Sequence, residues 1–255
     1  MRFILWLYNV GVTLAAWAYF TLGFVLFHAP FYLVALTRPD SAARFQRYNR
    51  RFLQRFFALI AALCPAVSWE IDPGIRDIRG AVVLCNHQSY LDSLLLISLL
   101  PRSVTVVKPT FFKVPIFAAL LRKTGYFPAT GRGPYGGLLL AALESLPEFF
   151  VAGGSLFLFP EGTRNRQSDD LLALQTGALK LALRAQDMQR PLAVLRVDGS
   201  KTLFPPGKFL FNAGTKNRVR LRLLATIAPG ECRNADQLRE RLEKIHASAR
   251  PASIH

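Results

Sequence analysis

The sequence predicts an α/β fold, in which a layered, largely parallel sheet is flanked by helices and preceded by an apolar helical segment. Two observations support this prediction. Beyond about residue 63, short apolar runs typical of strands alternate with longer stretches of helical periodicity. Before that point, residues 3–37 contain no Asp, Glu, Lys or Arg. We therefore divide the chain into residues 1–37, 38–62 and 63–255.

The first segment is long and apolar enough to enter a membrane. As one straight helix, residues 3–37 would measure about 52 Å, whereas the hydrocarbon core of a bilayer is roughly 30 Å thick. The segment therefore either spans once with a long tail or folds back near Gly11, Gly23 or Pro30. A buried core hairpin is the alternative, but so long a charge-free stretch is unusual in soluble folds. We expect a membrane-embedded apolar helix or helical hairpin.

The second segment, residues 38–62, is rich in arginine, and Asp40 or Ser41 is its candidate N-cap. Helical spacing places a basic stripe beside a mostly aromatic one. The two stripes are Arg44, Arg47, Arg51 and Arg55, and Phe45, Phe52, Phe56 and Leu59. Such a helix suits the interface of an anionic leaflet, although a solvated charged face is the simpler alternative. The positive-inside tendency then places this side in the cytoplasm.

The composition limits the classes of function. The chain has 255 residues, 51% of them hydrophobic, with 32 Lys+Arg against 16 Asp+Glu and a net charge of +16. These values exclude a disordered chain and fit one domain with a small appendage. The wide spacing of Cys64, Cys85 and Cys232 excludes a disulfide framework and a CxxC-type metal site. The charge requires an anionic partner, which is nucleic acid, an anionic membrane surface or a phosphorylated substrate.

The third segment supplies the sheet and its flanking helices. The expected strands are residues 66–71, 81–85, 103–108, 155–159, 192–197 and 218–226. The expected helices are residues 91–100, 115–123, 136–150, 176–186 and 235–249. Asn234 is the candidate cap of the last helix. Residues 199–214, rich in Gly and Pro, are expected to form a long surface loop.

His87 is the histidine placed where α/β proteins build their sites, directly after a buried strand and before a helix. Asp92 follows five residues later. A carboxylate bonded to one ring nitrogen fixes the tautomer and makes the other nitrogen a general base. The same residues also match a capping box, with Ser89 as the cap and Asp92 at its third position. The two interpretations are compatible, and residue patterns alone leave both open.

A second polar group follows another apolar strand, at residues 159–165 (Phe-Pro-Glu-Gly-Thr-Arg-Asn). Gly162 allows a ligand to approach the backbone, whose amides can bind an anion or a developing oxyanion. Arg164 can bind phosphate through two parallel N–H···O hydrogen bonds. Glu161 would orient the arginine or a substrate hydroxyl. The alternative is a polar turn with a local ion pair between Glu161 and Arg164.

Taken together, the two groups resemble a known family. Residues 86–92 (Asn-His-Gln-Ser-Tyr-Leu-Asp) and 159–164 (Phe-Pro-Glu-Gly-Thr-Arg) look like the two hallmark blocks of glycerolipid acyltransferases, which include the 1-acylglycerol-3-phosphate and lysophospholipid acyltransferases. The resemblance covers roughly residues 63–230 and extends to the apolar N-terminal segment. It implies a glycerol-3-phosphate acyltransferase-like fold and an O-acyltransferase activity.

The resemblance also implies roles for individual residues. By position, His87 would deprotonate the acceptor hydroxyl, and Asp92 would orient it. The second block, Glu161, Gly162, Thr163 and Arg164, would bind the acceptor, with Arg164 on its phosphate. The acyl donor would be a thioester of coenzyme A or acyl carrier protein, which is a substrate, so no cofactor and no metal are expected. The hydroxyl would attack directly, although Cys85 leaves a Cys–His nucleophile formally open.

One block departs from the family pattern. The family has a glycine followed by an arginine six residues later, whereas here Gly125 is followed by Gly131 at that spacing and by Arg132 one position further. Arg132 is still our candidate for a second phosphate contact. The displacement also leaves open an acceptor without phosphate, such as a lyso-ornithine lipid or another hydroxylated lipid.

We therefore expect the protein to acylate a lysophospholipid, giving phosphatidic acid from 1-acyl-sn-glycerol 3-phosphate. Its expected partners are the phospholipid surface, the lysophospholipid, the acyl thioester and, as an alternative donor, acyl carrier protein. The expected location is the cytoplasmic face of a membrane, and small size with no terminal retrieval signal favours a bacterial inner membrane. A non-catalytic scaffold or a nucleic-acid-binding membrane protein is the rival class, but no nucleic-acid-binding motif is present, and no nucleic-acid partner is expected.

Overall fold

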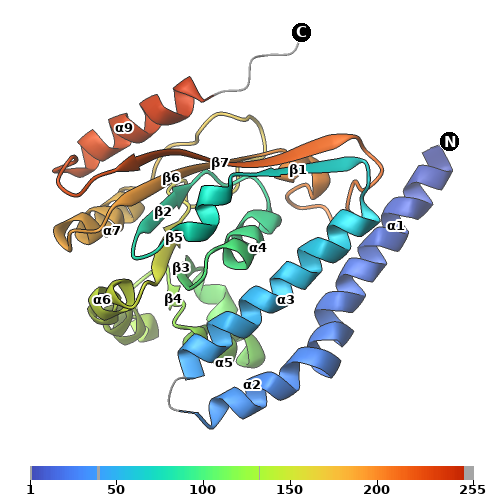
Figure 1. Cartoon of the computed structure of the whole chain (residues 1–255), viewed down its shortest axis with the longest axis horizontal. Coiled ribbons are helices and arrows are strands. Elements are labelled where there is room, and N and C mark those ends of the chain that lie inside the picture. Colours follow the sequence, from blue (N-terminus) through green and yellow to red (C-terminus); the bar gives the residue numbers. More distant parts are fainter. Residues whose placement is uncertain (1, 39–40, 132, 250–255) are drawn as a thin grey trace.

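The computed structural model describes residues 2–38, 41–131 and 133–249. Within these residues, seven strands form one sheet in the order β1-β7-β6-β2-β5-β3-β4 (Figure 1). The strands are β1 (Val67–Ile71), β2 (Val82–Cys85), β3 (Ser103–Val107), β4 (Phe127–Pro128), β5 (Ser155–Leu158), β6 (Leu192–Asp198) and β7 (Asn217–Ile227). Neighbouring strands are parallel except β6 and β7, which are antiparallel. The predicted largely parallel sheet is confirmed.

Six of the strands lie where the apolar runs predicted them, within a few residues. The seventh, β4, was missed because two residues carry no periodicity that could indicate a strand. The helices that come after β1 are α4 (Tyr90–Leu99), α5 (Pro115–Thr124), α6 (Gly136–Val151), α7 (Thr176–Asp187), α8 (Ser200–Leu203) and α9 (Ala235–Ser248), with short 3₁₀ turns η2 (Pro73–Asp77), η3 (Pro109–Lys113) and η4 (Gly133–Tyr135). The Asn234 side chain caps α9 as expected, by accepting from the amides of Asp236 and Gln237.

Helices cover both faces of the sheet, because side chains on a strand alternate between its two faces. Val82 and Leu84 of β2 pack in a core cluster with α6, α7 and α9. Val83 and Cys85 pack in a second cluster, on α4. The central strands β2, β5 and β6 are therefore buried on both sides, as their continuous apolar sequences require.

The N-terminal segment is helical from Arg2 to Leu36, as α1 (Arg2–Ala18), the π-helix η1 (Tyr19–His28) and α2 (Ala29–Leu36). The helix does not break at any of the three expected residues, and the chain changes direction gradually across η1 (Figure 1). The return leg is the basic helix α3 (Ser41–Leu63). The apolar run itself is thus one continuous bent helix, and whether it spans a membrane stays a prediction. Asp40, the alternative cap, lies outside the described residues.

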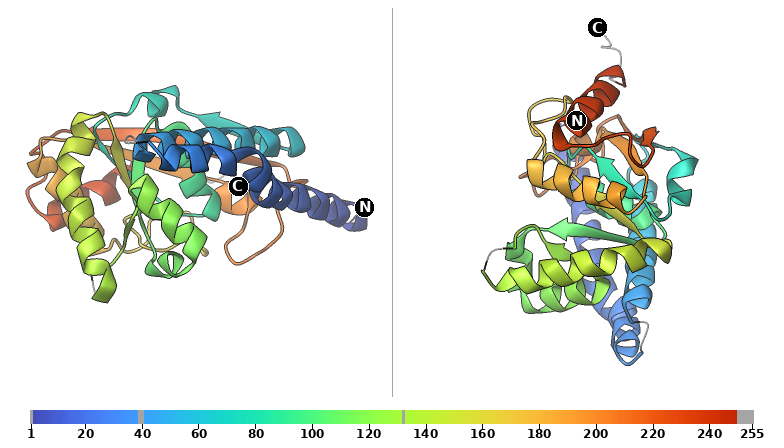
Figure 2. Two further views of the ribbon diagram at one scale, coloured as in Figure 1. Left: turned by 90° about the horizontal axis from the view of Figure 1, so that it is seen from below. Right: turned by 90° about the vertical axis from the view of Figure 1, so that its left-hand side faces the viewer.

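The stretch Arg2–Leu26 is, among the described residues, the one helix long and apolar enough to cross a membrane. Its exposed side chains include Phe3, Ile4, Leu14 and Leu22. Figure 2 shows the N-terminal end of α1 projecting beyond the layers of the sheet. An apolar surface of this size on a projecting helix is typical of membrane contact rather than of a soluble core.

The aromatic stripe of α3 packs against the protein, while the interfacial position of the helix stays a prediction. Phe45, Phe52 and Phe56 are buried inside the protein. Phe52 stacks on Tyr19 with ring centroids 4.8 Å apart, and Phe56 packs edge-on against Phe20 at 4.5 Å. The aromatic rings of α3 thus attach the apolar N-terminal helix to the domain. Packing against Tyr19 and Phe20 buries aromatic surface of both helices. The arginine stripe stays at the surface of the protein.

The expectation of a surface loop over residues 199–214 needs a correction. The segment opens with α8, and Phe204, Phe211 and Ala213 are buried. All three lie in a core cluster with Val12 of α1. The loop is therefore packed beneath the N-terminal helix, with its tip at the surface.

Candidate active site

The two motifs meet because the strands that precede them are neighbours. β2 and β5 pair in parallel, with Leu84 opposite Leu158, so the residues just beyond both strands emerge at the same edge of the sheet. The His87 ring stacks on Phe159 with centroids 4.0 Å apart and planes at 15°. The Asn165 amide donates a hydrogen bond of 2.7 Å to the His87 carbonyl. The structure thus brings the two motifs together, although they lie about 70 residues apart in sequence.

The capping box and the histidine–carboxylate pair both exist, and they share one oxygen. Asp92 Oδ2 lies 2.9 Å from His87 Nδ1 and accepts from the amides of Gln88 at 2.6 Å and Ser89 at 2.7 Å. The Ser89 hydroxyl in turn accepts from the Leu91 amide, which completes the cap of α4. The two interpretations that the sequence left open are therefore both realised.

This arrangement assigns the proton on the imidazole. Asp92 is 2% exposed, and its Oδ2 accepts two backbone N–H groups, so this oxygen acts as an acceptor. An accepting oxygen pairs with a donor on His87, which places the hydrogen on Nδ1. The lone pair is then on Nε2, which is the nitrogen available to take a proton. A neutral histidine held in this tautomer can act as a general base.

Glu161 holds the backbone of the site. The side chain is buried, its Oε1 accepts from the His87 amide at 2.7 Å, and its Oε2 accepts from the Leu172 amide at 2.9 Å. Burial raises the pKa of Glu161, while the two amide bonds act in the opposite direction. Both oxygens are therefore engaged by the protein itself. Its role toward the acceptor, taken from the resemblance, stays a prediction.

Arg164 does not pair with Glu161, so the local ion pair suggested for this turn is wrong. Its guanidinium lies over the ring of Tyr90, with Cζ 3.6 Å from the ring centroid. The buried Nε makes no hydrogen bond within the described part of the chain. A guanidinium stacked on a ring can still bind phosphate through its terminal N–H groups.

Of the remaining candidates, the structure describes Gly162 and Thr163 but not Arg132. Gly162 adopts φ +66° in a turn closed by its amide on the Phe159 carbonyl, and Thr163 is exposed beside it. The positive φ explains the glycine, because an L side chain would be strained there. Arg132, the proposed second phosphate contact, lies outside the described residues.

Cys85 is unsuited to act as a nucleophile. It is fully buried in β2, and burial, reinforced by the nearby carboxylates of Asp92 and Glu161, raises the pKa of its thiol. A thiol that does not ionise is a poor nucleophile. Its Sγ points toward Asn86 Oδ1, 3.8 Å away, so it is part of the packing of the strand end.

Three supporting residues escaped sequence reasoning. Asn86 bridges β2 to β6, since its side chain donates to the Val197 carbonyl at 2.8 Å and accepts from the Val197 amide at 2.7 Å. Tyr90 carries the Arg164 guanidinium. Arg196, fully buried in β6, donates to the Asp169 carbonyl in the loop after the second motif. An arginine within an apolar strand is unusual, so the sequence could have drawn attention to Arg196. Asn86 and Tyr90 are marked only by their place in the first motif.

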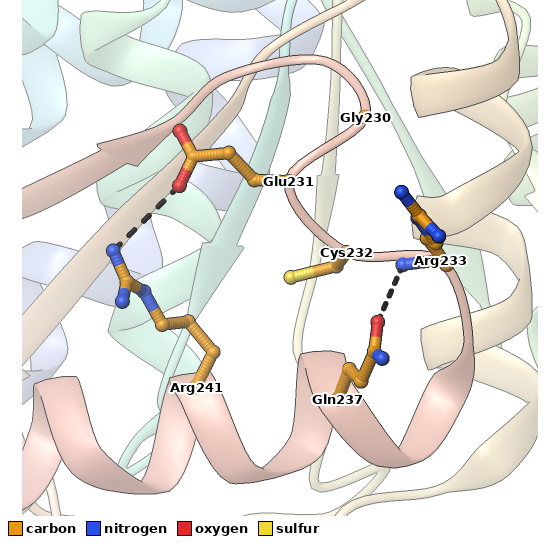
Figure 3. A pocket seen from close by; sticks show the side chains of 6 residues that line it. All are labelled: Gly230, Glu231, Cys232, Arg233, Gln237 and Arg241. Atoms are coloured by element: carbon orange, nitrogen blue, oxygen red, sulfur yellow. Dashed lines mark hydrogen bonds and ion pairs between the residues drawn. The ribbon is translucent and has the colours of Figure 1, made fainter.

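Two cavities lie away from these residues. One, of about 350 Å³, opens between the loop after β7 and α9 and is lined by Gly230, Glu231, Cys232, Arg233, Gln237 and Arg241 (Figure 3). The other, of about 300 Å³, lies between α3 and the end of α4 and is lined by Ala43, Arg47, Arg50, Arg51, Gln54, Pro101 and Arg102. Neither includes a residue of the two motifs. The catalytic candidates instead meet at the strand ends.

Comparisons with known proteins find relatives of this chain. The family model described as Acyltransferase matches residues 70–195. The 1-acyl-sn-glycerol-3-phosphate acyltransferase of Helicobacter pylori is 24% identical over 78% of this chain and 79% of its own length. The chloroplast enzyme LPAT1 of Arabidopsis thaliana, with the same activity in its name, is 26% identical over 71% of this chain and 49% of its own. The chain thus spans about half the length of that plant relative.

A solved structure is similar over nearly the whole chain. The crystal structure of the 1-acyl-sn-glycerophosphate acyltransferase from Thermotoga maritima aligns with a TM-score of 0.71, covering 97% of both chains at 20% sequence identity. At that identity the likeness supports the fold. It includes the N-terminal helices as well as the sheet, because the alignment leaves only a small part of the chain uncovered.

Proposed function

Because the chain belongs to the glycerolipid acyltransferase family, we propose that it transfers an acyl chain from a thioester to the free hydroxyl of 1-acyl-sn-glycerol 3-phosphate. The product is phosphatidic acid, and the donor is acyl coenzyme A or acyl carrier protein. One observation carries the proposal: His87, whose Nδ1 bonds Asp92, and the Arg164 guanidinium, which lies over the Tyr90 ring, follow neighbouring strand ends.

In the proposed reaction, His87 Nε2 accepts the proton of the acceptor hydroxyl as that oxygen attacks the thioester carbonyl carbon. The new C–O bond forms a tetrahedral oxyanion, and the C–S bond then breaks as the carbonyl is restored. The imidazolium returns its proton to the leaving thiolate, so proton and electron pairs balance. Asp92 stabilises the imidazolium while it exists, since it is an ionised partner on Nδ1. No acyl-enzyme is needed.

The acceptor is proposed to bind through its phosphate. The Arg164 guanidinium lies over the Tyr90 ring, and its N–H groups are proposed to form bidentate bonds to phosphate oxygens. The exposed turn at Gly162 and Thr163 lies next to it in sequence and offers a close approach to the backbone. A phosphate on this site would bring the glycerol hydroxyl toward His87.

The protein is proposed to work on the cytoplasmic face of a membrane. The apolar helix Arg2–Leu26 supplies the attachment, and the lysophospholipid acceptor resides in the same bilayer. Arg47, Arg51 and Arg55 of α3 lie at the surface, and cations close to an apolar helix favour the cytoplasmic side. The His87 site would then receive its acceptor from the leaflet to which the protein is bound.

The experiment that tests this proposal measures thiol release from an acyl thioester by the purified protein in lipid micelles. Wild type and His87→Ala are each given 1-acyl-sn-glycerol 3-phosphate, a lyso-ornithine lipid or no acceptor. Release that requires both the phosphorylated acceptor and His87 is expected. Release with the ornithine lipid alone would keep the chemistry and replace the acceptor. Release without an acceptor would indicate a thioesterase, and no release would overturn the catalytic assignment.

A further inference from the structure

The loop of residues 204–214 (loop 204–214) is held on the N-terminal helix by polar contacts. The Phe211 amide donates to Thr13 Oγ1 at 2.9 Å, and the Gly214 amide donates to Asn9 Oδ1 at 3.1 Å. Polar side chains in an apolar helix are unfavourable unless they find partners. Here they bond backbone amides of a segment some 200 residues away. The loop and α1 therefore form one unit.

The tip of loop 204–214 presents an aromatic ring to the outside. Phe209 is 60% exposed and stacks face to face on Trp17 of α1, with centroids 5.2 Å apart and planes at 4°. Trp17 is itself 40% exposed, and Leu14 one turn before it is exposed as well. Lys208 lies beside Phe209 and is also exposed. An exposed aromatic pair next to a lysine has the composition that interfacial segments use.

The base of the same loop contacts the catalytic motif. The Ser89 hydroxyl donates to the Phe204 carbonyl at 2.7 Å, and the Phe204 ring stacks on Phe211 with centroids 4.5 Å apart. Ser89 is the residue that caps α4 and is bonded through its amide to Asp92. The loop that carries Phe209 at its tip thus contacts, at its base, the residue that caps α4 beside His87.

From these contacts we propose that loop 204–214 inserts Phe209 into the interfacial layer of a phospholipid bilayer. It would be a second membrane contact beside the N-terminal helix, and it would set the height of the His87 site above the lipid. The proposal rests on the membrane attachment proposed above but not on the identity of the acceptor. Its partner is the lipid surface, because the ring continues the exposed apolar face of α1.

Site-directed fluorescence tests the proposal on the full chain. Cys64, Cys85 and Cys232 are buried, so a thiol-reactive, polarity-sensitive dye reports on an added cysteine. The dye is placed by Phe209→Cys at the loop tip and by Leu14→Cys on α1. The control is Glu243→Cys, an exposed position on α9, which packs on the opposite face of the sheet from α4. Wild type treated with the dye gives the background.

The protein is bound to vesicles of equal parts phosphatidylcholine and phosphatidylglycerol, with or without acyl-chain-brominated lipid. Quenching by brominated lipid and shielding from iodide are expected at positions 14 and 209, and the reverse at 243. A dye at 209 that iodide reaches as freely as at 243, while position 14 is quenched by lipid, would overturn the loop contact alone. Absence of lipid quenching at 14 and 209 together would overturn the membrane attachment as well.

A second variant guards against a label that disturbs the loop. Lys208→Cys places the dye one residue away without removing the ring, and the same lipid quenching is expected. In addition, Phe209→Ser should weaken binding to these vesicles roughly tenfold, which matches the partial burial of one aromatic side chain, whereas Phe209→Trp should retain it. Equal vesicle binding by wild type, Phe209→Ser and Phe209→Trp would contradict the proposal.

Discussion

The guanidinium of Arg164 lies 3.6 Å from the ring centroid of Tyr90, and this contact joins the two motifs of the site. Tyr90 is the first residue of α4, between the cap and Asp92, whereas Arg164 comes after β5. The helix that positions the base thus also positions the proposed phosphate ligand. Cation and ring are close enough for a cation–π contact, which positions the arginine and does not occupy its N–H groups.

The Tyr90 ring should therefore govern binding of the acceptor. Tyr90→Leu removes the face on which Arg164 rests, and the KM for the phosphorylated acceptor is expected to rise about fivefold, equivalent to about 1 kcal/mol. The kcat should change little, since His87 and Asp92 are untouched. Tyr90→Phe keeps the ring and is the matched control. Steady-state kinetics with varied acceptor measure the difference, and equal KM values for Leu and Phe would contradict it.

Asp92 has two functions, and two variants separate them. Asp92→Asn removes the charge that fixes the His87 tautomer and stabilises the imidazolium, so kcat should fall at least about 100-fold. Ser89→Ala weakens the cap of α4 but leaves the bond between His87 Nδ1 and Asp92. It should lower the free energy of unfolding by about 1 kcal/mol while most activity remains. If Asp92→Asn and Ser89→Ala lost activity equally, Asp92 would act only by capping α4 and not by orienting His87.

Much of this site could be predicted from sequence, for a physical reason. Apolar runs indicate buried strands locally, and parallel strands deliver the residues beyond their carboxyl ends to one edge of the sheet, so His87 and Arg164 could be expected to meet. The expectations that failed depend on contacts distant in sequence. The assembled fold decides whether Phe52 faces the solvent side or Tyr19. It also decides whether Glu161 pairs with Arg164 or with two backbone amides. No periodicity carries that information.

Glu161 should make stability depend on pH in an unusual direction. Burial raises its pKa above the ordinary value of 4.5, so the folded state favours the protonated form. Protonated Glu161 then adds to the free energy of unfolding. This contribution is fully present below the pKa of Glu161 in the unfolded chain and is lost as pH rises through its pKa in the folded protein. Glu161→Gln cannot ionise and should lack this loss. Urea unfolding of both proteins from acid to neutral pH measures it, and a constant difference between them would refute the assignment.

His246 on α9 should act in the opposite direction. Burial, assisted by the Arg196 guanidinium, lowers the pKa of His246 to about 4 from 6.5. A depressed pKa means that the neutral ring stabilises the fold above pH 6.5, and that this contribution is lost as pH falls toward 4. The loss should reach up to about 3 kcal/mol. His246→Gln should be less stable near neutrality but should lack this acid-dependent loss.

The matched control for His246 is Ser248→Ala, an exposed position at the same end of α9. It should keep the wild-type pH dependence of the free energy of unfolding. The His246 ring lies in the electrostatic field of Arg196, Arg222 and Asp198, and the two arginines both bond Asp198. Protonation would add a third cation to that group, which is why acid should loosen α9 from the sheet first. Hydrogen exchange of α9 amides at acid pH, compared between wild type and His246→Gln, measures this directly, and identical exchange in the two proteins would show that the histidine is not the acid-sensitive group.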